Sequence, residues 1–173
     1  PSKITLFPCN GTQVYQWKNR SWRQTLSKDM ESLIGKDIFR EIVSLILELQ
    51  NSFASDIKFK DVPLIGHFIS YRGSMINWCP LGRDASFSHR KEFEAIDSDI
   101  GARAFLIERF LSRLSFKGIE GIIAVIGGNT SIDIYPSGWD KTFALSHLKG
   151  REVWFVGDRC TGSGNDRSIY ELL

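Results

Sequence analysis

The alternation of helix-like and strand-like patterns in the middle of the chain most constrains what this sequence can fold into. Helices are expected over three segments, since apolar residues recur at helical spacing in the first and last of them: 37–49, 88–95 and 101–115. Short β-prone runs occur in two pairs, 65–71 with 74–79 and 121–126 with 131–135. Asp37 is the expected N-cap of the first helix, and Asp97-Ser98-Asp99 offers capping groups before the last. This order predicts an α+β fold, with helices on one face of an antiparallel sheet.

The two ends of the chain carry strand patterns of other kinds. Residues 4–7 and 12–17 flank Pro8-Cys9-Asn10-Gly11, whose Asn-Gly pair predicts a turn, so we expect a strand–turn–strand at the start. Residues 153–156 are a continuous apolar run that ends in Gly157-Asp158. Such a run predicts a buried parallel strand of an α/β core with an acidic residue at its carboxyl end.

Composition argues against several classes of partner. The 173 residues include 22 basic and 20 acidic side chains, and the net charge of +2 favours neither nucleic acid nor a membrane surface as the main partner. No run of about 18 apolar residues is present. The start of the chain does not have the pattern of a signal peptide. Cys9, Cys79 and Cys160 form no Cys-x-x-Cys pair, which is typical of reduced thiols in a cytosolic protein.

The last strand of the middle region has one apolar and one polar face. Because successive side chains of a strand point to opposite faces, Ile132 and Ile134 share one face and Ser131, Asp133 and Tyr135 share the other. The sequence therefore predicts that a polar Ser-x-Asp face is presented to a ligand or to another element.

Two further groups of polar residues are candidates for ligand binding. Asp158, followed by Gly162-Ser163-Gly164-Asn165-Asp166, offers oxygen ligands for Mg²⁺ at a strand end; the alternative is a solvated loop in which Asp166 caps a helix. Lys141 can neutralise a transferring phosphate, although a lone lysine is more often a surface cation.

Arginines near the middle strands are candidates for holding a phosphate. Guanidinium groups suit bidentate capture of a phosphate dianion, and the alternative is three solvated side chains: Arg72, Arg83 and Arg90.

The chain resembles the eukaryotic-type α-phosphomannomutases of the haloacid dehalogenase superfamily in four motifs, which occur in the family's order and approximate spacing. They are 71–77 (Tyr-Arg-Gly-Ser-Met-Ile-Asn), 80–83 (Pro-Leu-Gly-Arg), 127–133 with 135–141, and 157–158 with 164–166. Phe7-Pro8 and Asn10-Gly11 also resemble the family's entry into its cap, with Cys9 in place of an acidic residue. Arg167 stands where the family usually has histidine.

This resemblance implies a fold, a division of the chain and a set of roles. The fold would be an α+β cap of the C2 type inserted into an incomplete α/β Rossmann-like core, with core segments at 1–18 and 135–173 and the cap at 19–134. Arg72, Arg83 and Arg90, with Asn77 nearby, would bind the distal phosphate, while Ser131 and Asp133 would bind sugar hydroxyls. Lys141 would be the core lysine. Asp158 would bind Mg²⁺, with Asn165 and Asp166 supporting it.

The activity implied is interconversion of mannose 6-phosphate and mannose 1-phosphate, through an aspartyl-phosphate and a hexose bisphosphate, with hexose 1,6-bisphosphate as activator. The family's Asp-x-Asp-Gly-Thr motif is absent here, and we interpret Asp97-Ser98-Asp99 as a helix cap. We therefore expect a truncated or partial protein, inactive in this form. A sugar-phosphate phosphatase and a non-catalytic binding module are the alternatives. The resemblance also implies a cytoplasmic enzyme that dimerises through the cap and binds neither nucleic acid nor membranes.

Overall fold

Two antiparallel sheets organise the computed structural model, which describes residues 4–150, 152–158, 160–162, 164 and 166–173. The smaller sheet has the order β1-β2-β3, with strands Thr5–Leu6, Gln13–Lys18 and Ser21–Ser27. The larger has the order β4-β5-β7-β6, with strands Ile69–Tyr71, Ile76–Trp78, Ile132–Pro136 and Ile122–Ile126. All pairings in both sheets are antiparallel.

The described residues form three long helices and several short ones. The α-helices are α1 (Met30–Ile34), α2 (Lys36–Ser55), α3 (Phe87–Ile100), α4 (Ala102–Phe116) and α5 (Arg167–Leu172). Three short 3₁₀ helices are η1 (Cys9–Gly11), η2 (Ile57–Phe59) and η3 (Lys141–His147). None of the helices within the described ranges is long and apolar enough to cross a bilayer.

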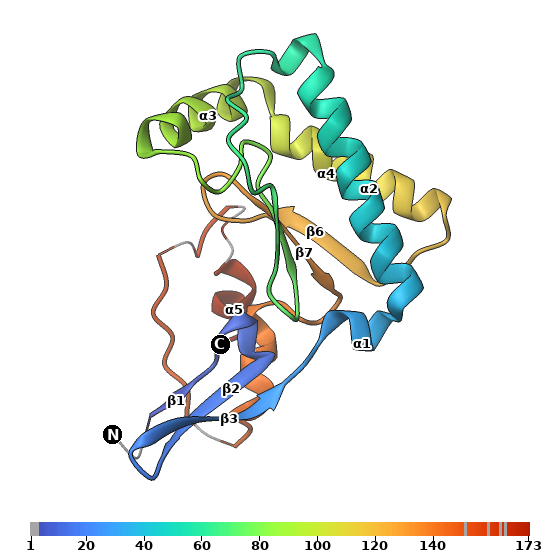
Figure 1. Ribbon diagram of the computed structural model, residues 1–173. Coiled ribbons are helices and arrows are strands. Elements are labelled where there is room, and N and C mark those ends of the chain that lie inside the picture. Colours follow the sequence, from blue (N-terminus) through green and yellow to red (C-terminus); the bar gives the residue numbers. More distant parts are fainter. Residues whose placement is uncertain (1–3, 151, 159, 163, 165) are drawn as a thin grey trace.

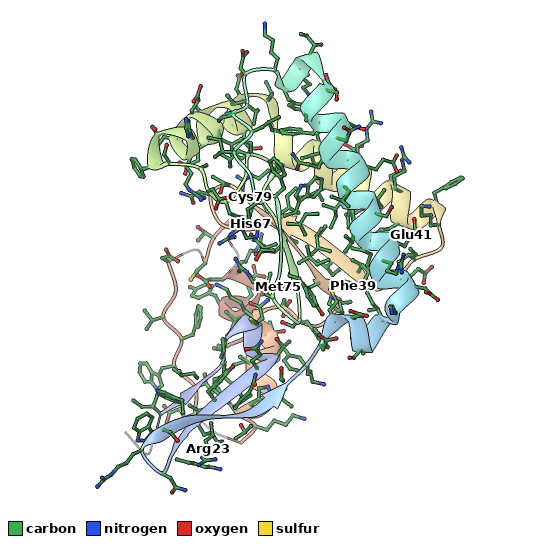
Figure 2. The ribbon with its side chains drawn as sticks, in the orientation of Figure 1. Arg23, Phe39, Glu41, His67, Met75 and Cys79 are labelled. Carbon is green, nitrogen blue, oxygen red and sulfur yellow. The ribbon has the colours of Figure 1, made fainter. Side chains whose placement is uncertain are left out.

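The core lies between the larger sheet and the layer formed by α2 and α4 (Figure 1). The predicted stripe of α2 supplies Ile42, Leu45 and Ile46, which are at most 1% exposed, and Trp78 of β5 is fully buried beneath them. Figure 2 shows the side chains gathered between these helices and the strands, among them Phe39 of α2. The centroid of the Phe39 ring lies 4.8 Å from that of Tyr71, and the two ring planes are tilted by 59°. The α+β prediction, with helices on one face of an antiparallel sheet, is confirmed for this part of the chain.

Several predicted element ends differ from the structure. Helix α2 begins at Lys36 after Gly35, so Asp37 lies in its first turn and is not its N-cap. Helix α3 continues to Ile100, so Asp97-Ser98-Asp99 belongs to its last turn. Asp97 nevertheless accepts the backbone N–H of Arg103 at 2.7 Å, which confirms its role as a capping group for α4.

Strand β3 was not expected, because its side chains follow no apolar alternation. It pairs with β2 through a tight turn in which Asn19 and Arg20 have φ of 51° and 61°, and Trp17 lies opposite Trp22. Two central residues with positive φ give a turn whose twist suits an antiparallel hairpin. The turn, together with the tryptophan pair, creates a strand that is exposed over most of its length.

The strand predicted over 153–156 is wrong for this structure. These residues form no strand, and Trp154 and Val156 are 88% and 97% exposed. A buried parallel strand needs neighbouring strands on which to form its hydrogen bonds. In the described residues every strand pairs antiparallel within the two sheets above, so this apolar run has no parallel partner.

Candidate functional site

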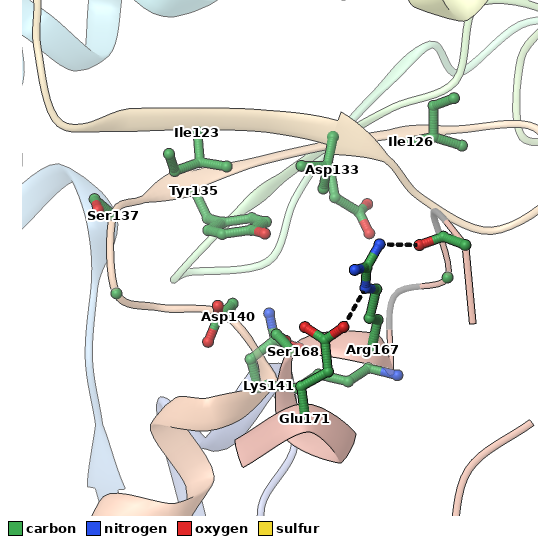
Figure 3. Close-up of a pocket in the computed structure, with 15 residues that line it drawn as sticks. Ile123, Ile126, Asp133, Tyr135, Ser137, Asp140, Lys141, Arg167, Ser168 and Glu171 are labelled. Atoms are coloured by element: carbon green, nitrogen blue, oxygen red, sulfur yellow. Dashed lines mark hydrogen bonds and ion pairs between the residues drawn. The ribbon is translucent and has the colours of Figure 1, made fainter. Parts of the chain in front are cut away.

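A cavity of about 610 Å³ lies between the larger sheet and the C-terminal segment, and Figure 3 shows the residues that line it. Strand β7 contributes Asp133 and Tyr135 to one wall. The other wall includes Asp140, Lys141 at the start of η3, and Arg167 at the start of α5. The volume lies within the usual range for small-molecule sites, which is roughly 300–1,000 Å³.

The polar face predicted for β7 lines this cavity. Ile132 and Ile134 are fully buried on the face toward the helices, while Asp133 and Tyr135 face the cavity. Ser131, just before the strand, is buried at 8% exposure. Gly127 packs so closely here that a Cβ atom would lie 2.7 Å from the Ser131 hydroxyl and 3.0 Å from the Asp133 carboxyl. A side chain at 127 would therefore displace both polar groups.

Tyr135 is a neutral hydrogen-bonding group in the cavity wall. Burial, assisted by the charges of Asp140 and Asp133, raises its pKa to about 12. The phenol therefore keeps its proton at neutral pH, and its O–H can donate a hydrogen bond to a hydroxyl or phosphate oxygen.

A chain of hydrogen bonds connects Asp133 to one of the predicted arginines. The Asn77 amide donates to Oδ1 of Asp133 at 2.6 Å, and Arg83 donates to the amide oxygen of Asn77. Arg83 follows Gly82, whose φ of +98° and close approach to the carbonyl oxygen of Ile65 leave no room for a Cβ atom. The Pro-Leu-Gly-Arg motif thus folds the backbone so that its arginine reaches β5.

The other two predicted arginines occupy different positions. Arg90 donates from Nε to the carbonyl of Ala85 at 3.0 Å, from one terminal nitrogen to Thr130 Oγ1 at 3.1 Å, and from the other to the carbonyl of Arg83. Arg72 is exposed in the turn between β4 and β5. The structure therefore brings Arg83 and Arg90 together and places Arg72 at the tip of the hairpin.

Lys141 and Asp166 form an ion pair at the far wall of the cavity. The Lys141 ammonium contacts Oδ1 of Asp166, and the two side chains are 32% and 6% exposed. Asp140 caps η3 by accepting the backbone N–H of Thr142 at 2.9 Å, which fixes the backbone from which Lys141 extends. The predicted lysine is thus a cavity residue held in place by a buried carboxylate.

The predicted magnesium ligands do not form a complete ligand set among the described residues. Asp158 is exposed, Asp166 is paired with Lys141, and Asn165 lies outside the described residues. Carboxylate oxygens are the donors that Mg²⁺ prefers, but the ion takes about six ligands. In the part of the chain that the structure describes, no three His, Cys, Asp or Glu side chains cluster closely enough to hold a metal ion.

The sequence did not single out Arg103, Thr130 or Asn10. Arg103 is an 8% exposed arginine paired with Asp97, and Asn10 lines the cavity and donates to the Trp139 carbonyl at 3.0 Å. The sequence pattern around an arginine does not show whether its side chain is buried or exposed. The Asn-Gly turn predicted at 10–11 was the one available signal for Asn10.

Fold and site together define an α+β protein with a cavity of small-molecule size, which has the Asp133 carboxylate on one wall and both cations and carboxylates on the other. Such a combination suits a ligand that carries both hydroxyl groups and negative charge.

Comparison with known proteins identifies the family. The family model described as eukaryotic phosphomannomutase matches residues 4–172, and the chain belongs to this family. The phosphomannomutase of Encephalitozoon cuniculi (strain GB-M1) is 35% identical over 168 residues, covering 95% of this chain and 60% of that protein. Those of Schizosaccharomyces pombe and Saccharomyces cerevisiae are each 32% identical, with 95% of this chain and 60% and 61% of those proteins covered. The chain thus spans about three fifths of the length of these curated relatives.

Proposed function

We propose that the intact protein is a phosphomannomutase that interconverts mannose 6-phosphate and mannose 1-phosphate. Membership of the family supports this activity. The observation that carries it is that the carboxylate of Asp133 and the ammonium of Lys141 stand on opposite walls of one cavity. A carboxylate accepts hydrogen bonds from sugar hydroxyls, while an ammonium neutralises phosphate charge, so a hexose phosphate satisfies both groups.

The proposal places the sugar ring along β7 and its two ends at opposite groups of cations. Asp133, with Ser131 beside it, binds hydroxyls. Arg83 and Arg90, with Asn77 and with Arg72 from the hairpin tip, grip the distal phosphate, and Lys141 serves the phosphate that is transferred. A partly desolvated charged hydrogen bond of this kind contributes about 1.5–3 kcal/mol.

The phosphoryl group in this proposal moves between the sugar and an aspartate. Transfer from an aspartyl-phosphate to a hydroxyl of the hexose monophosphate gives a hexose bisphosphate, which turns in the site and returns its other phosphoryl group to the same carboxylate. We assign that nucleophile to the part of the intact protein that corresponds to the unmatched length of the relatives. Closure around the ligand would exclude the water that hydrolyses the phosphoenzyme.

The same proposal includes the cofactors, the division into domains, the subcellular location and the oligomeric state. Mg²⁺, with Asp158 as one ligand and Asn165 and Asp166 in its loop, would stabilise charge on the transferred phosphate, and hexose 1,6-bisphosphate would prime the enzyme. Residues 19–134 would be the cap of a haloacid dehalogenase enzyme, and 1–18 and 135–173 would belong to its core. The enzyme would be cytoplasmic and would form a homodimer through the cap.

Product analysis tests the proposed activity. Intact protein is incubated with mannose 1-phosphate and a hexose bisphosphate, and both mannose 6-phosphate and free phosphate are measured. Formation of mannose 6-phosphate is the expected result. Release of free phosphate without mannose 6-phosphate would identify a phosphatase, and binding without either product would identify a non-catalytic module.

A further inference from the structure

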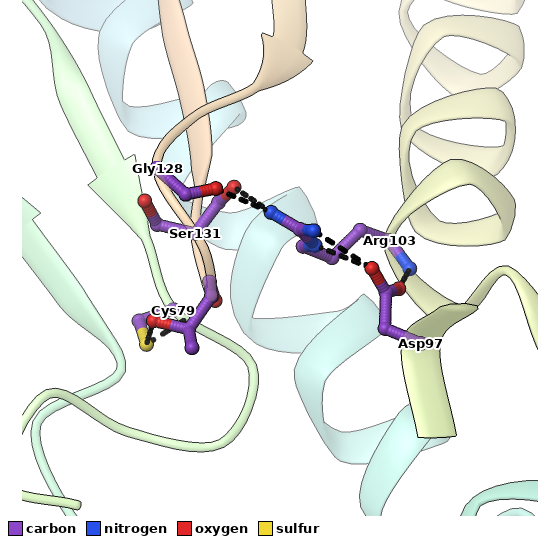
Figure 4. Close-up of polar contacts among 6 residues, drawn as sticks. Cys79, Asp97, Arg103, Gly128 and Ser131 are labelled. Atoms are coloured by element: carbon purple, nitrogen blue, oxygen red, sulfur yellow. Dashed lines mark hydrogen bonds and ion pairs between the residues drawn. The ribbon is translucent and has the colours of Figure 1, made fainter. Parts of the chain in front are cut away.

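Arg103 is buried but does not line the cavity. Its guanidinium group contacts the Asp97 carboxylate on one side and two backbone carbonyls on the other. Its Nε and one terminal nitrogen contact Oδ2 of Asp97, each at 2.8 Å, and its backbone N–H donates to Oδ1 of the same carboxylate. The other terminal nitrogen donates to the carbonyl of Gly128 at 2.8 Å and to that of Ser131 at 3.3 Å (Figure 4). The two side chains of the pair are each 10% exposed.

The two carbonyls belong to the turn that leads from β6 into β7. Asp133, whose carboxylate lines the cavity, is the second residue of β7 and so lies just after this turn. Thr130, within the turn, has partners in other elements. Arg90 donates to Thr130 Oγ1 at 3.1 Å, and the Cys79 thiol donates to the Thr130 carbonyl at 3.4 Å. The turn is therefore fixed by α4 on one side and by α3 and the residue that follows β5 on the other.

The burial of this ion pair argues for a geometric role more than for a stabilising one. Removing two charges from water costs much of what their attraction returns, so a buried pair is weak grounds for stability. The planar guanidinium of Arg103 instead holds two carbonyls of one turn, those of Gly128 and Ser131, in a fixed geometry. A shift of about 1 Å in a binding group is enough to weaken its action strongly.

We propose that Arg103 is a positioning residue that sets the ligand affinity of the cavity by holding the 128–131 turn and thereby the Asp133 carboxylate. This inference rests on the proposed function for the nature of the ligand, a hexose phosphate. Arg103 acts through the backbone of the turn and has no contact with the ligand itself.

The test compares two arginines of the same helix. The double variant Asp97→Asn/Arg103→Met removes the buried charges together and keeps an oxygen for the backbone N–H of residue 103. Arg113→Met is the matched control, because Arg113 also lies on α4 and pairs with Glu48 at 2.9 Å, but both side chains are about half exposed. Mannose 1-phosphate affinity by calorimetry, the unfolding midpoint and amide hydrogen exchange over 127–133 are measured for each.

We expect the double variant to fold, to exchange the turn amides faster and to bind mannose 1-phosphate about tenfold more weakly. Arg113→Met should match the unaltered chain in affinity and in exchange. Arg103→Lys, which keeps the charge but not the fork, should lie between and serves if the double variant does not fold. Unchanged affinity and exchange in a folded Arg103 variant would overturn the proposal. Absence of binding by the unaltered chain would refute the proposed function instead, and the exchange data would still show whether Arg103 holds the turn.

Discussion

Replacing Lys141 by methionine tests whether the cavity cation is held by a buried carboxylate. The change removes the cation that pairs with Asp166, whose side chain is only 6% exposed. Loss of one partner of a buried ion pair costs about 3–5 kcal/mol. Because Lys141 itself is 32% exposed, we expect a value near the lower end, about 3 kcal/mol. For a chain of this length each kcal/mol lowers the unfolding midpoint by about 2–4 °C, so Lys141→Met should lower it by about 6–12 °C.

Thermal unfolding followed by circular dichroism measures this shift. The double variant Lys141→Met/Asp166→Asn removes the buried charge as well, and it should recover most of the lost stability while still failing to bind mannose 1-phosphate. Recovery of stability without recovery of binding separates the structural effect of the pair from the role of the ammonium in the cavity. A Lys141→Met variant as stable as the unaltered chain would contradict the burial of the ion pair and the cost expected from it.

Three further outcomes are expected, two from described contacts and one from the proposed function. Arg83→Ala should weaken mannose 1-phosphate binding at least about tenfold in calorimetry, since a charged hydrogen bond contributes about 1.5–3 kcal/mol, and an unchanged affinity would remove Arg83 from the site. Burial and the hydrogen bond to Asp29 raise the pKa of Tyr71 to about 12, so its stabilising effect is complete below pH 10 and is lost as pH rises through 12. Tyr71→Phe should therefore flatten the alkaline limb of a stability–pH curve measured by urea unfolding, and an identical limb would contradict this. A sample verified by mass as residues 1–173 should show no mutase turnover, and measurable turnover would refute the assignment of the nucleophile to another part of the protein.

The elements that could be predicted from sequence are those with strong periodicity. The stripe of Ile42, Leu45 and Ile46 predicted α2, and the glycine turns between paired apolar runs predicted the β4–β5 and β6–β7 pairs of the larger sheet. Strand β3 could not be found in the same way, because a strand exposed on both faces has no apolar alternation. For residues 153–156 the sequence pattern predicts a strand that the structure does not have. An apolar run forms a buried strand only where neighbouring strands pair with it, and no described strand does so here.

The sequence indicated the types of residue in the candidate site better than their positions relative to one another. The alternation along β7 correctly placed Asp133 on a polar face, and the structure adds that Lys141 lies across the same cavity. Arg103 could not be distinguished from surface arginines, because its burial depends on the β6–β7 turn packing against α4. Long-range contacts of this kind leave no local pattern in the sequence.

A crystal structure of the chain with mannose 1-phosphate would show whether the cavity between β7 and the C-terminal segment binds a hexose phosphate. We expect the sugar in this cavity, with a hydroxyl on the Asp133 carboxylate and the phosphate on Lys141 or on the arginines beyond Asn77. A ligand bound to another surface, with the cavity filled only by water, would contradict it.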